Sequence, residues 1–515
     1  MAWTIGLLVV FFAITIGIGL YCRRHSTDVN GFVLGGRSVG PWLTAFAYGT
    51  SYFSAVIFVG YAGQFGWKFG VASTWIGVGN AVIGSLLAWV VLGRRTRLMS
   101  QHLGSATMPE FFEKRFASPA LKIAASVLVF IFLIPYTASL YNGLSRLFDM
   151  AFPGIDYAWC VVIMAVLTCI YVTAGGYMAT AINDFIQGII MLVGIVAIIA
   201  AVLSQGGGFI ESLNGLANIK AEGVAPGAFN SFFGPDPLNL MFVVILTSLG
   251  TWGLPQMVQK FYSIKSEKDI SKGTIISTIF AIVVAGGCYF LGGFGRLFSD
   301  KIGVDAAGMP NGGFDNIIPT MLETLSPVLV AVVIVLVFAA SMSTLSSLVL
   351  ASSSTLTLDL IKGHVVKNMS EKKQVFIMRV LIVVFVAISA FIAINKDKLS
   401  AIADMMGISW GALAGAFLAP FLFGLYWKRT TKESVWASFI FGAGIMILNM
   451  LFRESFPLVL QSPINCGVIA MLGGIAIVIV VSLITPKPDK ELVDNAFSCY
   501  EIEVVVPAKK SLGIK

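Results

Sequence analysis

The chain has 515 residues, of which 57% are hydrophobic and only 12% are charged. Soluble domains carry about 25% charged residues, so this composition excludes an ordinary soluble fold and predicts an all-α integral membrane protein. A net charge of +8 and six scattered cysteines without a Cys-x-x-Cys pair give no support to nucleic-acid binding, a disulfide framework or a cysteine-ligated metal.

Apolar runs of about 20 residues, long enough to cross a bilayer as a helix, recur along the whole chain. Thirteen transmembrane helices are expected, near residues 2–21, 41–62, 71–95, 121–149, 157–175, 183–204, 239–262, 272–297, 326–354, 375–394, 405–426, 435–452 and 466–485. No connection is long enough for a soluble domain. The segment 486–515 is predicted to be a charged tail, disordered or weakly docked.

Charges on the connections predict the orientation. Arg23 and Arg24 follow the first span and no basic residue precedes it, which is the reverse of a signal peptide and predicts a retained helix with its N-terminus outside. With loops assigned alternately from there, the large majority of Lys and Arg, Lys260 included, fall on one side. The positive-inside rule makes that side cytoplasmic. We therefore expect a multi-pass protein of the plasma membrane, surrounded by the lipid bilayer, with a cytoplasmic C-terminus.

Two spans contain helix-breaking residues near their middle. Residues 49–54 read Gly-Thr-Ser-Tyr-Phe-Ser in the second span, and residues 250–255 read Gly-Thr-Trp-Gly-Leu-Pro five spans later. Interrupted helices at matching places in two halves are typical of transporters whose binding site lies between inverted repeats. For either helix alone, an ordinary packing kink is the competing interpretation.

The ninth span carries a stripe of small and hydroxyl side chains. Ala340, Ser343, Thr344 and Ser347 follow the spacing i, i+3, i+4, i+7 and share one helix face. Such a face suits close helix packing or coordination of a sodium ion by neutral oxygens. Composition alone leaves both interpretations open.

Seven sequence segments, in this order, resemble segments of one protein family. They are LGGRSVGPW (34–42), GTSYFSAVIFVG (49–60), MPEFFEKRF (108–116), YVTAGGYMATAINDFIQ (171–187), GLPQMVQKFYSIKS (253–266), AASMSTLSS (339–347) and GLYWKRTTKESVWASFIFG (424–442). The family is that of sodium/solute symporters, which includes proline, pantothenate, sialic acid and sodium/glucose symporters. The resemblance runs from about residue 30 to 445.

This resemblance implies a LeuT-like fold with a five-plus-five inverted repeat. Residues 1–30 would form an extra N-terminal helix and linker, and residues 31–430 the transporter core, with repeats at about 41–204 and 239–426. Residues 431–485 would add two C-terminal helices, before a cytoplasmic tail at 486–515. The implied function is sodium-driven import of a small organic solute by alternating access, by a monomer.

Other classes fit less well. A nucleotide-driven pump would need a phosphate-binding loop, and no G-x-x-x-x-G-K-[ST] string occurs. An enzyme would need a catalytic cluster inside the membrane, which the sequence does not show, so no catalytic activity is expected. A proton-coupled or channel-like member of the family stays an alternative.

The resemblance implies that Na⁺ is the co-transported ion. Its principal site would be formed by the carbonyls of Thr50, Phe53 and Ala340 with the hydroxyls of Ser343 and Thr344.

Some members of the family have a second sodium site. It would fall here on Asp184, Ser346 and Ser347. Asp184 can equally be a solvated charge near a helix end, so one or two sodium ions both stay open.

The substrate residues depart from those of the relatives. Val56 and Ile57 stand where sugar carriers have polar residues, and Val56, Thr247 and Thr251 replace aromatic residues of the proline branch. An amino acid such as proline or a small monocarboxylate is favoured over a sugar or sialic acid. The candidate lining residues are Tyr52, Ser54, Phe58, Asn80, Tyr136, Thr251, Trp252 and Gln256.

Overall fold

The computed structural model describes residues 2–152, 154–305, 308–366, 368–395 and 402–501, and these residues are overwhelmingly helical. The helices are α1 (Ala2–Cys22), α2 (Val29–Leu34), α3 (Pro41–Tyr52), α4 (Ala62–Phe69), α5 (Thr74–Gly79), α6 (Arg94–His102), α7 (Met108–Phe116), α8 (Pro119–Ala151), α9 (Tyr157–Gln205), α10 (Phe209–Ala217), α11 (Pro237–Leu249), α12 (Pro255–Ser263), α13 (Glu267–Ala281), α14 (Gly287–Gly292), α15 (Ser299–Ile302), α16 (Ile317–Glu323), α17 (Pro327–Thr355), α18 (Glu371–Ile394), α19 (Ile402–Tyr426), α20 (Lys432–Leu451), α21 (Leu458–Gln461), α22 (Pro463–Ile484) and α23 (Lys490–Ser498).

Short π-helical and 3₁₀ segments connect several of these helices. The π-helical ones are η3 (Val56–Tyr61) before α4, η5 (Asn80–Leu87) and η6 (Trp89–Gly93) between α5 and α6, η9 (Ile282–Gly286) between α13 and α14, and η12 (Leu356–Val365) after α17. The 3₁₀ segment η8 (Gly250–Gly253) lies between α11 and α12. Every predicted span overlaps a helical segment.

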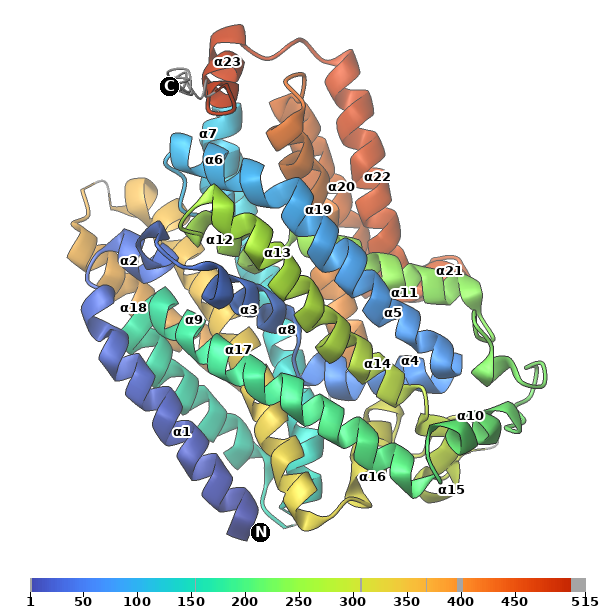
Figure 1. Cartoon of the computed structure of the whole chain (residues 1–515). Helices are drawn as coiled ribbons and strands as arrows, with labels where there is room; N and C mark the ends of the chain where they lie inside the picture. The colour runs from blue at the N-terminus through green and yellow to red at the C-terminus, as the bar shows by residue number, and fades with distance from the viewer. Residues whose placement is uncertain (1, 153, 306–307, 367, 396–401, 502–515) are drawn as a thin grey trace, which may run out of the picture.

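Helix α17 lies at the centre of the molecule. It packs against α9, α8, α3 and α1, and from Val333 to Thr355 all of its residues are buried. Helices α20 and α22 pack on α19, along the side drawn in orange and red (Figure 1). The hydroxyl stripe of α17 therefore faces protein rather than lipid.

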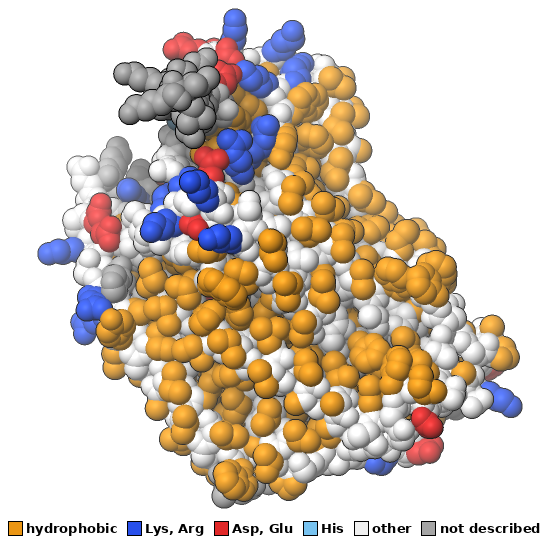
Figure 2. Space-filling view, viewed as in Figure 1, with side chains coloured by type: hydrophobic (Ala, Val, Ile, Leu, Met, Phe, Trp, Pro, Cys, Tyr) orange, Lys and Arg blue, Asp and Glu red, His pale blue; other side chains and the backbone are white. Residues whose placement is uncertain are grey.

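The outer surface is that of a membrane protein. Large apolar side chains are exposed along α1, α9, α13, α18 and α22, and they cover the flank seen in Figure 2. Basic side chains gather at the end that holds α6, α7 and α23. Among the described residues, ten helical segments are long and apolar enough to span a bilayer, or eleven when the bent pair α11–α12 counts as one.

Two predicted spans form one continuous helical segment. The sequence predicts separate helices at 157–175 and 183–204, but α9 runs from Tyr157 to Gln205 with one non-helical residue, Gly176 (φ 55°). A Cβ at Gly176 would lie 2.8 Å from the Phe32 carbonyl oxygen, so only glycine fits this position. The chain changes direction in a single residue and needs no loop.

The predicted disordered or weakly docked tail is partly wrong. Residues 490–498 form α23, which begins at the Asp489 cap and packs against α6 and α7. Lys428 Nζ lies 3.1 Å from Asp494 Oδ1, and the Arg115 guanidinium stacks over the Phe497 ring at 4.9 Å. These aromatic and basic contacts fix the start of the tail. Residues 502–515, including the 504–506 valine run, lie outside the described part of the chain.

Helices α4 and α14 pack so closely that the contact requires glycine on both sides. A Cβ on Gly66 would lie 1.9 Å from the Gly292 carbonyl oxygen, and a Cβ on Gly292 would lie 2.1 Å from that of Ala62. Small residues at a membrane helix interface allow this approach of backbones. The contact holds α4, which continues the first interrupted helix, against the second half of the chain.

We predict that Gly66→Ala lowers the thermal stability of the purified protein strongly. An added methyl group in a packed core lowers the free energy of unfolding by about 1–3 kcal/mol even where neighbouring side chains can move. Here the neighbouring atoms belong to the backbone, which cannot move aside. Gly6→Ala in α1 is the control, because a Cβ there meets nothing within 4 Å. Equal melting temperatures for the two variants, measured by thermal shift in detergent, would contradict the packing argument.

Candidate functional site

The predicted interruptions of the second and seventh spans are confirmed. Helix α3 ends at Tyr52, and Phe53 takes extended backbone angles (φ −83°, ψ 118°) before η3 begins at Val56. Leu254 takes nearly the same angles (φ −88°, ψ 122°) between η8 and α12, where the chain bends by 49°. Each break leaves the last carbonyls of a helix without intrahelical partners inside the protein.

The first break meets the hydroxyl stripe of α17. Thr344 Oγ1 lies 3.1 Å from the Thr50 carbonyl oxygen, 3.1 Å from that of Phe53 and 3.2 Å from that of Ala340. A hydroxyl has one proton to donate, so three carbonyls around it exceed what it can satisfy. Four of the five oxygens predicted for the principal sodium site thus lie together, fully buried and rich in lone pairs.

The fifth predicted ligand points elsewhere. Ser343 Oγ donates a hydrogen bond of 2.6 Å to Asp184 Oδ1. Asp184 is 1% exposed, so the alternative of a solvated charge at a helix end is wrong. The Ser343 hydroxyl therefore connects the principal site to the buried carboxylate.

The other two residues predicted for a second sodium site make different contacts. Ser346 Oγ donates to the Ser343 carbonyl of its own helix at 2.8 Å. Ser347 Oγ lies 2.9 Å from Ser51 Oγ in α3 and accepts a hydrogen bond of 3.0 Å from Lys260 Nζ. Asp184 and Ser347 thus flank one place, and the Lys260 ammonium lies there.

The charge pattern of the sequence predicts that Lys260 is a loop charge on the cytoplasmic side, and this prediction is wrong. Lys260 is 3% exposed in α12, and its Nζ lies 3.9 Å from Asp184 Oδ2. The available signal was its position in the half-helix after the second break, five residues beyond Pro255. A lysine inside this short half-helix lies within the predicted span, where its side chain must point into the protein or reach out of the membrane.

Three candidate substrate residues hold the helices around the second break together. The Asn80 amide lies within hydrogen-bonding distance of Thr247 Oγ1 (2.9 Å) and Ser248 Oγ (3.0 Å). Thr251 Oγ1 lies 3.3 Å from the Gly84 carbonyl oxygen in η5, and Trp252 Nε1 donates to the Ile83 carbonyl at 3.0 Å. These contacts make them positioning residues of the break.

The remaining candidates differ in how far their polar atoms are used. Ser54 Oγ accepts a hydrogen bond of 3.2 Å from the Val56 N–H, at the start of η3. Phe58 is fully buried. The side chain of Tyr52 lies outside what the structure describes. Tyr136 stacks edge-on to Trp410 with ring centroids 5.9 Å apart, and its hydroxyl lies beside the side chains of Ser54 and Trp410.

Gln256 is the strongest of the substrate candidates. It lies in the first turn of α12, directly after the second break, and is 1% exposed. Within the described part of the chain, neither its amide nitrogen nor its amide oxygen has a hydrogen-bond partner. Burying an amide unpaired is costly, so the side chain is suited to a polar ligand.

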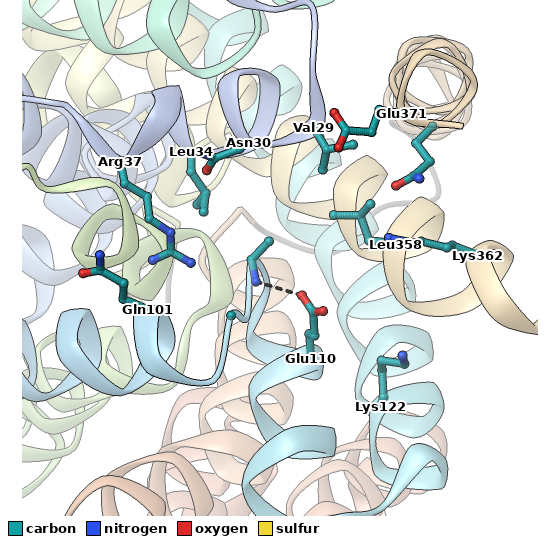
Figure 3. Close-up of a pocket in the computed structure, with 13 residues that line it drawn as sticks. Val29, Asn30, Leu34, Arg37, Gln101, Glu110, Lys122, Leu358, Lys362 and Glu371 are labelled. Atoms are coloured by element: carbon teal, nitrogen blue, oxygen red, sulfur yellow. Dashed lines mark hydrogen bonds between the residues drawn. The ribbon is translucent and has the colours of Figure 1, made fainter. Parts of the chain in front are cut away.

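A polar cavity of about 600 Å³ opens at the end of the molecule that carries the basic side chains (Figure 3). Arg37, Gln101, Glu110, Lys122, Lys362 and Glu371 are among its lining residues. Arg37 donates to the carbonyls of Ser105 (2.6 Å) and Tyr262 (3.1 Å), and burial lowers the pKa of its guanidinium from the ordinary value. The cavity lining includes none of the predicted sodium or substrate residues.

The profile of the "Sodium:solute symporter family" matches residues 32–442. The chain belongs to this family. It is accordingly a sodium-coupled symporter and a multi-pass membrane protein, and sodium is its co-transported ion.

Named relatives match over nearly the whole chain. The osmoregulated proline transporter of Bacillus subtilis is 29% identical over 484 residues, covering 93% of this chain and 94% of that protein. Sodium/proline symporter 2 of Staphylococcus saprophyticus is 29% identical over 451 residues, with 86% and 85% covered. The sodium/proline symporter of Staphylococcus aureus is 29% identical over 496 residues, with 94% and 92% covered.

Solved structures show the same fold. A sodium-coupled sialic acid symporter in a substrate-bound outward-open state superposes with a TM-score of 0.73 at 18% identity, over 95% of this chain and 99% of that one. A nucleobase-cation-symport-1 family transporter, closed around bromovinylhydantoin, gives 0.51 at 15% identity, over 92% and 98%. The predicted membership and the LeuT-like fold are confirmed.

We predict that Thr344→Ala raises the sodium concentration for half-maximal transport about tenfold, because a lost ligand costs about 1–3 kcal/mol. Ser353→Ala is the matched control: this buried hydroxyl on the same helix donates only to the Leu350 carbonyl, at 3.2 Å. Transport by Thr344→Ala with the sodium dependence of the control would show that the stripe serves packing alone.

Proposed function

We propose that the chain is a sodium-driven importer of a small zwitterion or monocarboxylate, with proline as the first candidate. The observation that carries the proposal is the Thr344 hydroxyl among the carbonyls of Thr50, Phe53 and Ala340. A sodium ion bound there by these four oxygens, with Ser343 as a fifth ligand, joins the first broken helix to α17. Binding then orders the contact between two elements that move relative to each other in an alternating-access cycle.

The proposed topology has thirteen spans in a five-plus-five inverted repeat, with one extra helix before and two after. The matching backbone angles of Phe53 and Leu254 support it, because equivalent breaks in two halves are what such a repeat produces. The N-terminus lies outside and the C-terminus in the cytoplasm, so the basic end with α6, α7 and α23 is cytoplasmic. Both breaks lie in one chain, which suits transport by a monomer.

The 600 Å³ cavity is then a cytoplasmic vestibule. It lies between the segment before the first broken helix, the α6–α7 connection and the end of η12. Its mixed charges, Arg37, Glu110, Lys122 and Glu371 among them, keep it hydrated without selecting one charge sign. Released sodium and solute would reach water through it.

The solute is proposed from the pocket chemistry and the relatives' names. Val56 and Ile57 are both buried and apolar near the first break, and sugar hydroxyls would find no partners on them. The carboxylate of a small solute suits the free N–H groups at the start of a half-helix or the bound sodium ion. The Gln256 amide supplies one more polar contact. Three relatives that match most of this chain are named as proline carriers.

The direct test is uptake of radiolabelled proline into proteoliposomes with and without an inward sodium gradient. We expect accumulation that requires the sodium gradient and that unlabelled proline, but not glucose or sialic acid, inhibits. By linkage, proline must also raise the apparent sodium affinity by the factor by which sodium raises that of proline. Uptake indifferent to sodium would overturn the proposal and favour proton coupling or a channel.

We predict that Gln256→Ala raises the proline concentration for half-maximal uptake about tenfold, which corresponds to one lost hydrogen bond of about 1.4 kcal/mol. Sodium dependence and solute-free thermal stability stay unchanged, because the amide has no partner to lose within the described residues. Gln259→Ala makes the matched comparison: its Nε2 donates to the Val33 carbonyl at 3.1 Å, so this variant loses stability instead. The same proline half-saturation in Gln256→Ala and the parent protein would remove Gln256 from the binding site.

A further inference from the structure

A buried ammonium group lies at the junction of four core helices. Lys260 extends from α12, and its Nζ donates to Ser347 Oγ in α17 at 3.0 Å. Ser347 Oγ lies 2.9 Å from Ser51 Oγ in α3, beside the first break. The ammonium also lies 3.9 Å from Asp184 Oδ2 and 5.1 Å from the centre of the Tyr177 ring, both in α9.

The oxygens around this ammonium are those that a second sodium ion would use. Asp184 supplies the carboxylate and Ser347 a hydroxyl, two of the three residues that the sequence predicted for such a site. A sodium ion added beside Lys260 would place two positive charges against one carboxylate in a region closed to water, where like charges repel strongly. Nζ lies between these oxygens, donating a hydrogen bond to Ser347 Oγ and facing the Asp184 carboxylate at ion-pair distance.

We propose, on the basis of the proposed sodium symport, that Lys260 is a tethered cation that fills the second cation site. The protein then binds and transports one sodium ion per solute molecule. A tethered cation neutralises Asp184 in every state of the cycle and is never released. The driving force consequently comes from a single ion at the principal site.

The geometry favours this role over a simple structural ion pair. Asp184 is 1% exposed and Lys260 3% exposed, and a buried pair of this kind contributes little net stability compared with apolar residues of the same size. The pair is also not isolated, since Asp184 Oδ1 accepts from Ser343, a predicted ligand of the principal site. The ammonium is thus placed where it can set the number of coupled ions.

The test is the number of sodium ions bound by the purified full-length protein, counted by equilibrium binding of radiolabelled sodium. We expect the parent protein to saturate at one ion per chain. Lys260→Ala, which leaves Asp184 without its cation and opens space beside it, should saturate at two. The double variant Lys260→Ala/Asp184→Asn should return to one, because the carboxylate that attracts the added ion is gone.

Two lysine variants serve as controls that should keep a count of one. Lys260→Arg retains the charge in place, and Lys428→Ala removes an exposed lysine paired with Asp494. Two ions on the parent protein, or one ion on folded Lys260→Ala, would overturn the tethered-cation proposal while leaving sodium symport intact. If Lys260→Ala does not fold, the parent count decides alone. A parent protein that binds no sodium would instead overturn the proposed function itself.

Discussion

The core is organised by backbone carbonyls that two interrupted helices expose away from water. An unpaired carbonyl inside a membrane protein costs several kcal/mol, so a break persists only where other groups satisfy it. At the first break the Thr344 hydroxyl lies against the Thr50 and Phe53 carbonyls, but its one proton cannot satisfy both together with Ala340. A deficit of positive charge remains at that point. The deficit that makes the break unfavourable is the physical basis of the proposed cation site.

At the second break, the polar groups make hydrogen bonds within the protein, so the two breaks differ in what they leave unpaired. Around η8 the side chains of Asn80, Thr251 and Trp252 make direct hydrogen bonds to neighbouring helical segments. This break is stabilised by the protein itself, and the Gln256 amide directly after it has no hydrogen-bond partner among the described residues. The first break thus keeps carbonyl lone pairs without a donor, which suits an ion. The second break is held by hydrogen bonds, and the unpaired Gln256 amide beside it suits a polar solute.

Sequence patterns predict those features of the fold that depend on the chemistry of neighbouring residues along the chain. The hydroxyl stripe follows from the 3.6-residue helix period, and the breaks follow from clustered Gly, Pro and hydroxyl residues; both were found. Features that depend on tertiary contacts were missed. The two spans predicted on either side of Gly176 are joined without a loop, and the close approach of Phe32 requires glycine there. Helix α23 docks through contacts to Arg115 and Lys428. The sequence predicts Lys260 as a loop charge because no sequence period reveals that Asp184, more than 70 residues earlier, is its partner.

The proposed principal site and the Lys260–Asp184 pair share one residue, Ser343. Its hydroxyl donates to Asp184 at 2.6 Å, so it coordinates sodium at the principal site only by turning away from that carboxylate. Asp184 then keeps the Lys260 ammonium, 3.9 Å away, as its compensating charge. Lys260 lies in the helix after the second break, and Ser51, beside the first break, contacts the same Ser347 that Lys260 reaches. Ser343, Asp184 and Lys260 thus connect the first break to the helix that follows the second through one hydroxyl, one carboxylate and one ammonium.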